Sequence, residues 1–109
     1  MLKWYSDLYI GEKANKKTKS IIRKINKGQG QITAFVITLA YNEEDQLEVF
    51  NASLLLQQLA RETCPMIIGI ASGYDEAIEL VTRITEEVYQ ETGTTDIRAY
   101  LEEKEVARS

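Results

Sequence analysis

The sequence predicts a small α/β domain in which helices pack on a small parallel-type sheet, in the order α-β-α-β-α-α. Two segments, residues 32–40 (ITAFVITLA) and residues 66–71 (MIIGIA), are apolar on both faces and rich in β-branched side chains, as is typical of buried central strands. A long amphipathic stretch follows the second segment. Because a helical crossover joins the two strands, we expect them to be parallel. Residues 5–10 or a second copy of the chain would supply a further strand.

Residues 1–11 form an aromatic-rich lead segment whose structure the pattern leaves open. Trp4, Leu8 and Ile10 stand at even spacing, as in a strand, whereas Tyr5, Leu8 and Tyr9 would suit a helical turn. In either case we expect the aromatic rings to cover an edge of the core.

Residues 12–27 are predicted to form a basic amphipathic helix. Its polar face carries four candidate partner-binding residues, Lys16, Lys17, Arg23 and Lys24. Residues 1–30 hold eight basic and two acidic side chains, whereas the rest of the chain holds five basic and fifteen acidic, so the net charge of −4 is unevenly distributed. A basic face of this kind can bind an anionic partner. It can equally lie beside an acidic helix of the same domain.

The middle of the chain contains a turn, a loop and one further helix. Residues 28–31 (GQGQ) form a turn that lacks the third glycine of a dinucleotide-binding motif. Residues 41–45 (YNEED) form an acidic loop without the spacing of a calcium site. Residues 47–50 are apolar, but whether they form a strand or a helix stays undecided. We expect a helix over residues 52–62.

The segment from Ser72 to Gly93 has the clearest local signals. Ser72 and Asp75 are predicted to form a capping box at the start of a long amphipathic helix. Gly93 is placed to end that helix in a left-handed conformation. A last helix is expected over residues 96–104, followed by a frayed tail at residues 105–109.

Composition restricts the classes of function. The chain of 109 residues has no histidine and a single cysteine, Cys64, which excludes Ser-His-Asp and Cys-His catalysis, His-bearing zinc sites and an internal disulfide. The longest apolar-dominated run, residues 32–40, is far shorter than the roughly 20 residues that span a bilayer. Residues 1–17 lack the apolar segment of a signal peptide. We therefore expect a single cytoplasmic domain over residues 1–109 that does not enter a membrane.

Several runs of the sequence resemble a group of small uncharacterised bacterial proteins of clostridial type, namely DLYIGEKANKK, VITLAYNEEDQL, and IIGIASGYDEAIELV with EEVYQETGTTDIRAYL. The resemblance covers nearly the whole chain. It implies an α/β fold, and it carries over neither an activity nor any catalytic residue.

The sequence favours binding over catalysis. One interpretation is a protein-interaction or regulatory module, in which the basic face binds a protein partner or identical chains associate as a homodimer. The basic helix has no aromatic side chain and no adjacent DNA-binding motif, so nucleic acid is not the expected partner. No catalytic residue, metal site or cofactor is predicted. Acidic residues at 43–45 and 75–76 could supply paired carboxylates, but such residues are common at strand ends and do not establish an enzyme.

The alternative interpretation is a domain that binds a small anion or nucleotide beyond the carboxyl ends of strands 32–40 and 66–71. The candidate ligand-binding residues at these two ends are Ser72, Gly73, Tyr74, Asp75, Tyr41 and Asn42. Backbone amides at the start of the long helix favour an anion. The carboxylates of Asp75 and Glu76 lie at the same helix start and already fill the role of such an anion.

Overall fold

The computed structural model describes residues 2–29, 33–42 and 44–108. Its strands are β1 Trp4–Ile10, β2 Ala34–Leu39, β3 Leu47–Asn51 and β4 Ile67–Ser72. Its α-helices are α1 Thr18–Asn26, α2 Gln58–Thr63, α3 Tyr74–Thr92 and α4 Ile97–Arg108, and the two short 3-10 helices are η1 Ala14–Lys17 and η2 Ala52–Leu56. Some sequence-based expectations lie outside the described residues: Gly30 and Gln31 in a turn, Ile32 in a strand, Glu43 in the acidic loop and Ser109 in the tail.

The strand order of the sheet is β1-β4-β2-β3, and only the pair β1–β4 is parallel. β2 runs antiparallel to both β3 and β4. The mixed α/β class is confirmed, but the expected parallel-type sheet of two or three strands was wrong in pairing, strand number and element order. The reason is the undecided segment, because residues 47–51 form β3 as a hairpin partner of β2. The helical crossover therefore joins β3 to β4, which point the same way, rather than β2 to β4.

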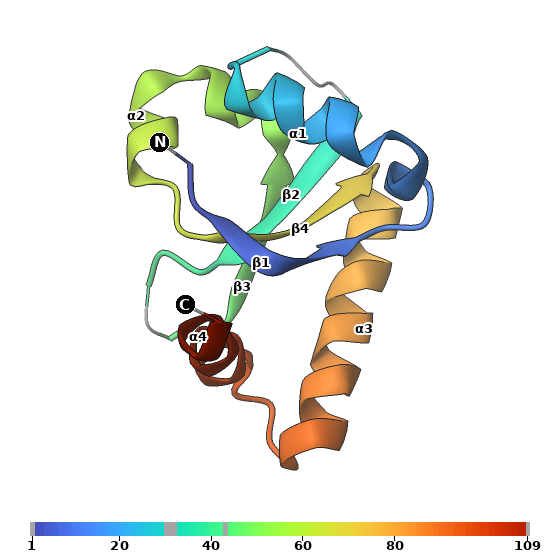
Figure 1. Ribbon diagram of the computed structural model, residues 1–109, viewed down its shortest axis with the longest axis vertical. Helices are drawn as coiled ribbons and strands as arrows, with labels where there is room; N and C mark the ends of the chain where they lie inside the picture. Colours follow the sequence, from blue (N-terminus) through green and yellow to red (C-terminus); the bar gives the residue numbers. More distant parts are fainter. Residues whose placement is uncertain (1, 30–32, 43, 109) are drawn as a thin grey trace.

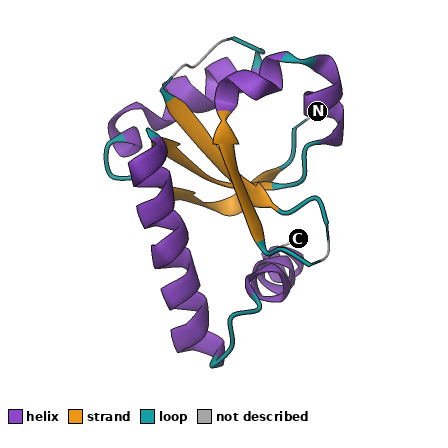
Figure 2. Ribbon diagram, turned by 180° about the vertical axis from the view of Figure 1, so that it is seen from behind, coloured by secondary structure: helices purple, strands orange, loops and turns teal. Residues whose placement is uncertain are grey.

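Two apolar clusters fill the space on either side of the sheet. α1 and α2 cover one face, and α3 and α4 lie on the other (Figure 1). The view from behind in Figure 2 shows the strands crossing between these two helical layers. β4 is central, and residues 67–71 are buried. The first cluster includes Ile21 and Ile25 of α1. The second includes the apolar stripe of α3 and the buried side chains of α4, namely Leu80, Ile84, Val88, Ile97 and Leu101.

The first and last parts of the chain lie side by side. Residues 4–10, whose type the sequence left open, form β1 at one edge of the sheet. The Ser6 backbone amide and hydroxyl donate to the Glu105 carboxylate at 3.0 and 2.9 Å, and Arg108 forms an ion pair with Asp7 at 2.7 Å. These contacts explain why α4 continues through Arg108, where the sequence predicted fraying from residue 105.

The helices on the first face are shorter than expected. The predicted helix 12–27 begins as η1 and becomes α1 only at Thr18. The predicted helix 52–62 is divided into η2 and α2 at Gln57, whose backbone is extended (φ −82°, ψ 130°).

The Arg61 side chain of α2 binds the last backbone carbonyl oxygens of α1. Its guanidinium donates to the carbonyl oxygens of Ile25 and Asn26, both at 2.7 Å, and to that of Leu55 at 3.2 Å. The last carbonyls of a helix have no partner within the helix, and a cation there also interacts favourably with the helix dipole. One side chain thus joins α1, η2 and α2.

We expect Arg61→Ala to lower the free energy of unfolding by about 2 kcal/mol, because it leaves three carbonyls, those of Ile25 and Leu55 in partly buried bonds, without charge-assisted donors. Urea denaturation measures this change. Lys27→Ala is the matched control, since Lys27 is an exposed cation at the same helix end and its loss should change stability by no more than about 0.5 kcal/mol. Equal effects of the two variants would contradict the assignment.

Candidate functional site

The structure divides the candidate ligand-binding residues between opposite ends of the sheet. Ser72 pairs with Ala34 at the start of β2, whereas Tyr41 and Asn42 follow the other end of that strand. The five residue steps of β2 span about 17 Å, so the two groups do not meet around one small ligand. The expectation that both strand ends share an edge was wrong because β2 and β4 are antiparallel.

Tyr41 and Asn42 belong to a loop that is bonded to β3 and α4. The Tyr41 amide donates to the Glu48 carboxylate at 2.8 Å. The Arg98 guanidinium donates to the carbonyl oxygens of Ala40 and Asn42. These hydrogen bonds hold the loop against β3 and α4.

Ser72, in contrast, lies beside the basic helix in a single cleft. This basic cleft has a volume of about 230 Å³ and lies between η1, α1 and the adjoining ends of β2 and β4. Its polar side chains are three lysines and three hydroxyl residues: Lys13, Lys17, Lys24, Ser20, Thr33 and Ser72. Ala14, Ile21 and Ala34 complete the described lining, which contains no acidic residue. The two groups of residues that the sequence suggested separately, a strand end and a basic face, therefore meet here.

Only half of the predicted basic face contributes to the basic cleft. Lys17 and Lys24 line it, whereas Lys16 lines a neighbouring cavity and the exposed Arg23 lines neither. The difference follows from helical spacing, because Lys17 and Lys24 are two turns apart and share one face, whereas Lys16 and Arg23 share the neighbouring face.

The start of α3 differs from the predicted capping box. Gly73, with a φ of 104°, is the N-cap residue, and no side chain caps the helix from that position. Tyr74 is more than half exposed and packs edge-to-face on Phe35, with ring centroids 5.8 Å apart, while Asp75 is exposed. The bond expected between Ser72 and Asp75 is replaced by one in which the Ser72 amide donates to Glu76 at 2.9 Å.

Glu76 connects α3 to the loop between β1 and η1. Its carboxylate accepts three backbone N–H bonds, from Ser72 at 2.9 Å, Lys13 at 2.8 Å and Ala14 at 3.2 Å. Lys13 and Ser72 both line the basic cleft. The carboxylate of Glu76 therefore sets the position of one cleft-lining residue relative to the other.

The protonation of Glu76 reflects this environment. Burial by itself raises the pKa of the carboxyl, but the backbone bonds from Ser72, Lys13 and Ala14 and the charge of Lys13 outweigh it, so that the pKa lies below its ordinary value. The group is ionised at neutral pH.

The position of the Glu76 carboxylate requires a glycine at position 11. A Cβ atom built on Gly11 would lie 2.0 Å from Oε1 of Glu76. The Gly11 amide also donates to the Ile70 carbonyl oxygen at 2.9 Å, and its own carbonyl accepts from Asn15 at 2.9 Å. The absence of a side chain at this position lets the loop close against α3.

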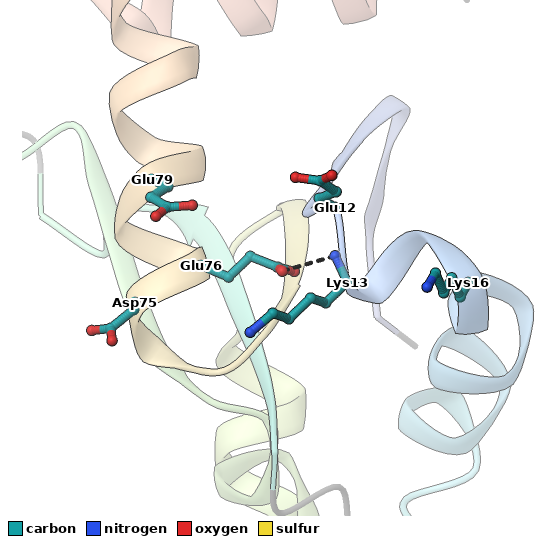
Figure 3. A pocket seen from close by; sticks show the side chains of 6 residues that line it. All are labelled: Glu12, Lys13, Lys16, Asp75, Glu76 and Glu79. Atoms are coloured by element: carbon teal, nitrogen blue, oxygen red, sulfur yellow. Dashed lines mark hydrogen bonds between the residues drawn. The ribbon is translucent and has the colours of Figure 1, made fainter.

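A second cavity of about 360 Å³, the acidic cavity, lies on the other side of Lys13. It is lined by four acidic and two basic side chains: Glu12, Asp75, Glu76, Glu79, Lys13 and Lys16. Figure 3 shows Glu12 and Glu79 facing each other across it, with Glu76 reaching to the backbone of Lys13 and Asp75 pointing away. Lys13 therefore separates a purely basic cleft from a predominantly acidic one.

Sequence reasoning did not name Lys13, Ser20 or Thr33 as site residues, and it placed Glu76 at the start of the long helix without identifying the three backbone amides that it binds. A signal for Glu76 was present, because with Gly73 as the N-cap this glutamate occupies the third helical position, where the acidic partner of a capping box belongs. Ser20 and Thr33 carry no comparable signal, since only the packing of α1 against the sheet brings them together.

The remaining chemistry of the described residues is limited. Burial raises the pKa of the Cys64 thiol, which disfavours the thiolate. Among the residues that the structure describes, no group of three or more acidic or cysteine side chains is placed to hold a metal ion. No helix within residues 2–29, 33–42 and 44–108 combines the length and the apolar character that crossing a membrane requires.

Comparisons with protein-family models, with curated proteins and with solved structures found no match. The resemblance to the clostridial-type group therefore stays a prediction.

We expect Glu76→Ala to lower the free energy of unfolding by about 2 kcal/mol at pH 7, because three backbone donors lose an ionised acceptor. The pKa of Glu76 is lowered on folding, so the carboxylate stabilises the protein fully above its ordinary value of 4.5 and loses this contribution as the pH falls through the lower folded value. Denaturation curves of the wild type and Glu76→Gln should therefore converge below pH 4.5. A stability difference that does not change with pH would contradict this assignment.

Gly11→Ala should be destabilising only while Glu76 is present. The new methyl group displaces the carboxylate, so Gly11→Ala and Glu76→Ala remove the same three bonds and their effects should not add. In a double-mutant cycle, we expect a coupling energy of about 1 kcal/mol or more. Additive effects would show that Gly11 and Glu76 act independently.

Proposed function

We propose that this protein is a regulatory or interaction module that binds a small anionic ligand in the basic cleft. One observation carries the proposal: three lysines and three hydroxyl groups line a single cleft whose described lining has no acidic residue. The strongest support is that the three lysines share one side of the helical segment over residues 13–24, and the fold brings Thr33 and Ser72, at the adjoining ends of β2 and β4, against that side.

Electrostatics supports an anion as the occupant. Lys13, Lys17 and Lys24 place three like charges on the lining of one cleft, where they repel one another; the Glu76 carboxylate offsets part of the charge of Lys13, and the described part of the chain contributes no ion pair to the three lysines. An anion in the cleft relieves this repulsion, and the hydroxyls of Ser20, Thr33 and Ser72 can donate to its oxygens.

The same residues support binding without catalysis. Ammonium and hydroxyl groups line the cleft, and its described lining has no carboxylate or imidazole to act as a general base. The nearest carboxylate, that of Glu76, is already held by three backbone amides. We infer that the cleft recognises a ligand rather than transforms it.

We expect the wild-type protein to bind inorganic phosphate or sulfate, as measured by amide chemical-shift changes in an NMR titration centred on Ser72 and Ser20. Lys17→Gln combined with Lys24→Gln should weaken this binding about tenfold or more, which corresponds to about 1.4 kcal/mol.

The matched control is Lys19→Gln combined with Lys27→Gln, which removes the same charge from exposed positions outside the cleft. Equal weakening by both pairs would indicate only a diffuse effect of net charge. The absence of binding by any small anion, together with capture of an acidic protein through Lys16 and Arg23, would replace the proposal with the protein-interaction alternative.

A further inference from the structure

We propose that the natural ligand of the basic cleft is the dianionic phosphate group of a small phosphate monoester, and that the acidic cavity beside Lys13 excludes longer polyanions. This inference rests on the proposed function and specifies the class of ligand. It depends on the size of the cleft, the number of its donors and the charge of its surroundings.

The size of the basic cleft restricts the ligand to a small group. Ligand sites for drug-sized molecules have volumes of about 300–1,000 Å³, and this cleft has about 230 Å³. It therefore accommodates a charged head group, while any organic part of the ligand extends towards solvent.

The donors of the cleft match a terminal phosphate better than other anions. A phosphate monoester has three free oxygens and carries up to two negative charges. A carboxylate or a phosphodiester has two free oxygens and one charge, which leaves more of the repulsion among Lys13, Lys17 and Lys24 unrelieved. With three lysines and the neighbouring carboxylate of Glu76, a dianion leaves the occupied site close to neutrality, and the three hydroxyls add donors without adding charge.

The acidic cavity provides the discrimination against polyanions. Glu12 and Glu79 face each other across it, and Lys13 lines both this cavity and the basic cleft. Four acidic and two basic residues line the acidic cavity, and the balance stays negative when Asp75, which points away, is left out. A chain of phosphates that continued from the basic cleft past Lys13 would meet these carboxylates, and like charges in such proximity oppose binding.

The position of this boundary is set by two backbone segments that the Glu76 carboxylate holds together. Glu76 holds the Lys13 and Ala14 amides on one side and the Ser72 amide on the other. The basic and acidic linings therefore remain adjacent, because a single carboxylate fixes both segments.

The charge state of the ligand can be tested by pH. The chain has no histidine, the side chain whose ordinary pKa lies between pH 5.5 and 7.5, and Glu76, the carboxylate nearest the cleft, has a lowered pKa and stays ionised over this range. The second ionisation of a phosphate monoester has a pKa of about 6, so its dianionic fraction falls about fourfold over this range. Sulfate keeps its charge and serves as the control ligand.

We expect the dissociation constant of glycerol 3-phosphate, measured by isothermal titration calorimetry, to be about fourfold higher at pH 5.5 than at pH 7.5. That of sulfate should not change. Binding of both ligands with no dependence on pH would overturn the inference while leaving the proposed function intact. Weakening of both ligands at low pH would overturn it as well, because the titrating group would then belong to the protein.

The exclusion of polyanions can be tested with Glu12→Gln combined with Glu79→Gln. We expect this variant to bind tripolyphosphate and a short oligothymidylate about fivefold or more tightly than the wild type does, with less than a twofold change for glycerol 3-phosphate. Glu86→Gln combined with Glu91→Gln is the matched control, since it removes the same charge from exposed positions further along α3.

Each failure has a distinct meaning in these experiments. If neither sulfate nor any phosphate compound binds the wild type, the proposed function itself is wrong. If the wild type binds the oligonucleotide or tripolyphosphate as tightly as the monoester, the cleft is a general polyanion site and the inference is wrong. If the control pair strengthens polyanion binding equally, net charge rather than the acidic cavity is responsible, and the inference is again wrong.

Discussion

The carboxylate of Glu76 is the interaction on which the geometry of the cleft depends. It accepts backbone bonds from residues that are more than fifty positions apart in the sequence, on the loop after β1 and at the end of β4. Because the acceptor is charged and the donors are rigid backbone groups, the contact is both directional and strong. Gly11 makes the close approach sterically feasible. The Gly11–Ile70 bond ties the start of the loop to β4, and the Glu76 contact extends this connection to Lys13 and Ala14.

The path of the chain through the sheet explains why the cleft lies at only one end. The hairpin adds β3 after β2 and reverses the direction of the chain. The helical crossover that follows β3 therefore leads into a strand, β4, that runs the same way as β3 and opposite to β2. The end of β4 then lies beside the start of β2, close to η1 and α1. The end of β2 is instead covered by α4, whose Arg98 binds the loop that follows. At one end of the sheet, α4 packs against the strand ends. At the other end, the cleft is lined by lysines that form no ion pair with the described residues.

The sequence predicted the elements that have strong local patterns, and it could not predict how they associate. Strands near residues 32–40 and 66–71 and the long helix ending at Gly93 follow from apolar periodicity and turn chemistry, and all are present. The segment 47–51 has few residues and no strong pattern, yet its strand character decides the pairing of the whole sheet. The candidate site was predictable in parts, since Ser72, Lys17 and Lys24 were each identified, but their meeting in one cleft depends on long-range pairing.

The start of α3 also has a consequence for how the protein could change over evolutionary time. In many α/β proteins a bound phosphate supplies the negative charge at a helix start, so that binding of the cofactor stabilises the folded state. Here the chain provides that charge itself through Glu76. The empty protein therefore needs no ligand to complete its fold. Substitutions at Lys17 or Lys24 can then change the charge of the basic cleft while the scaffold that presents these residues is retained.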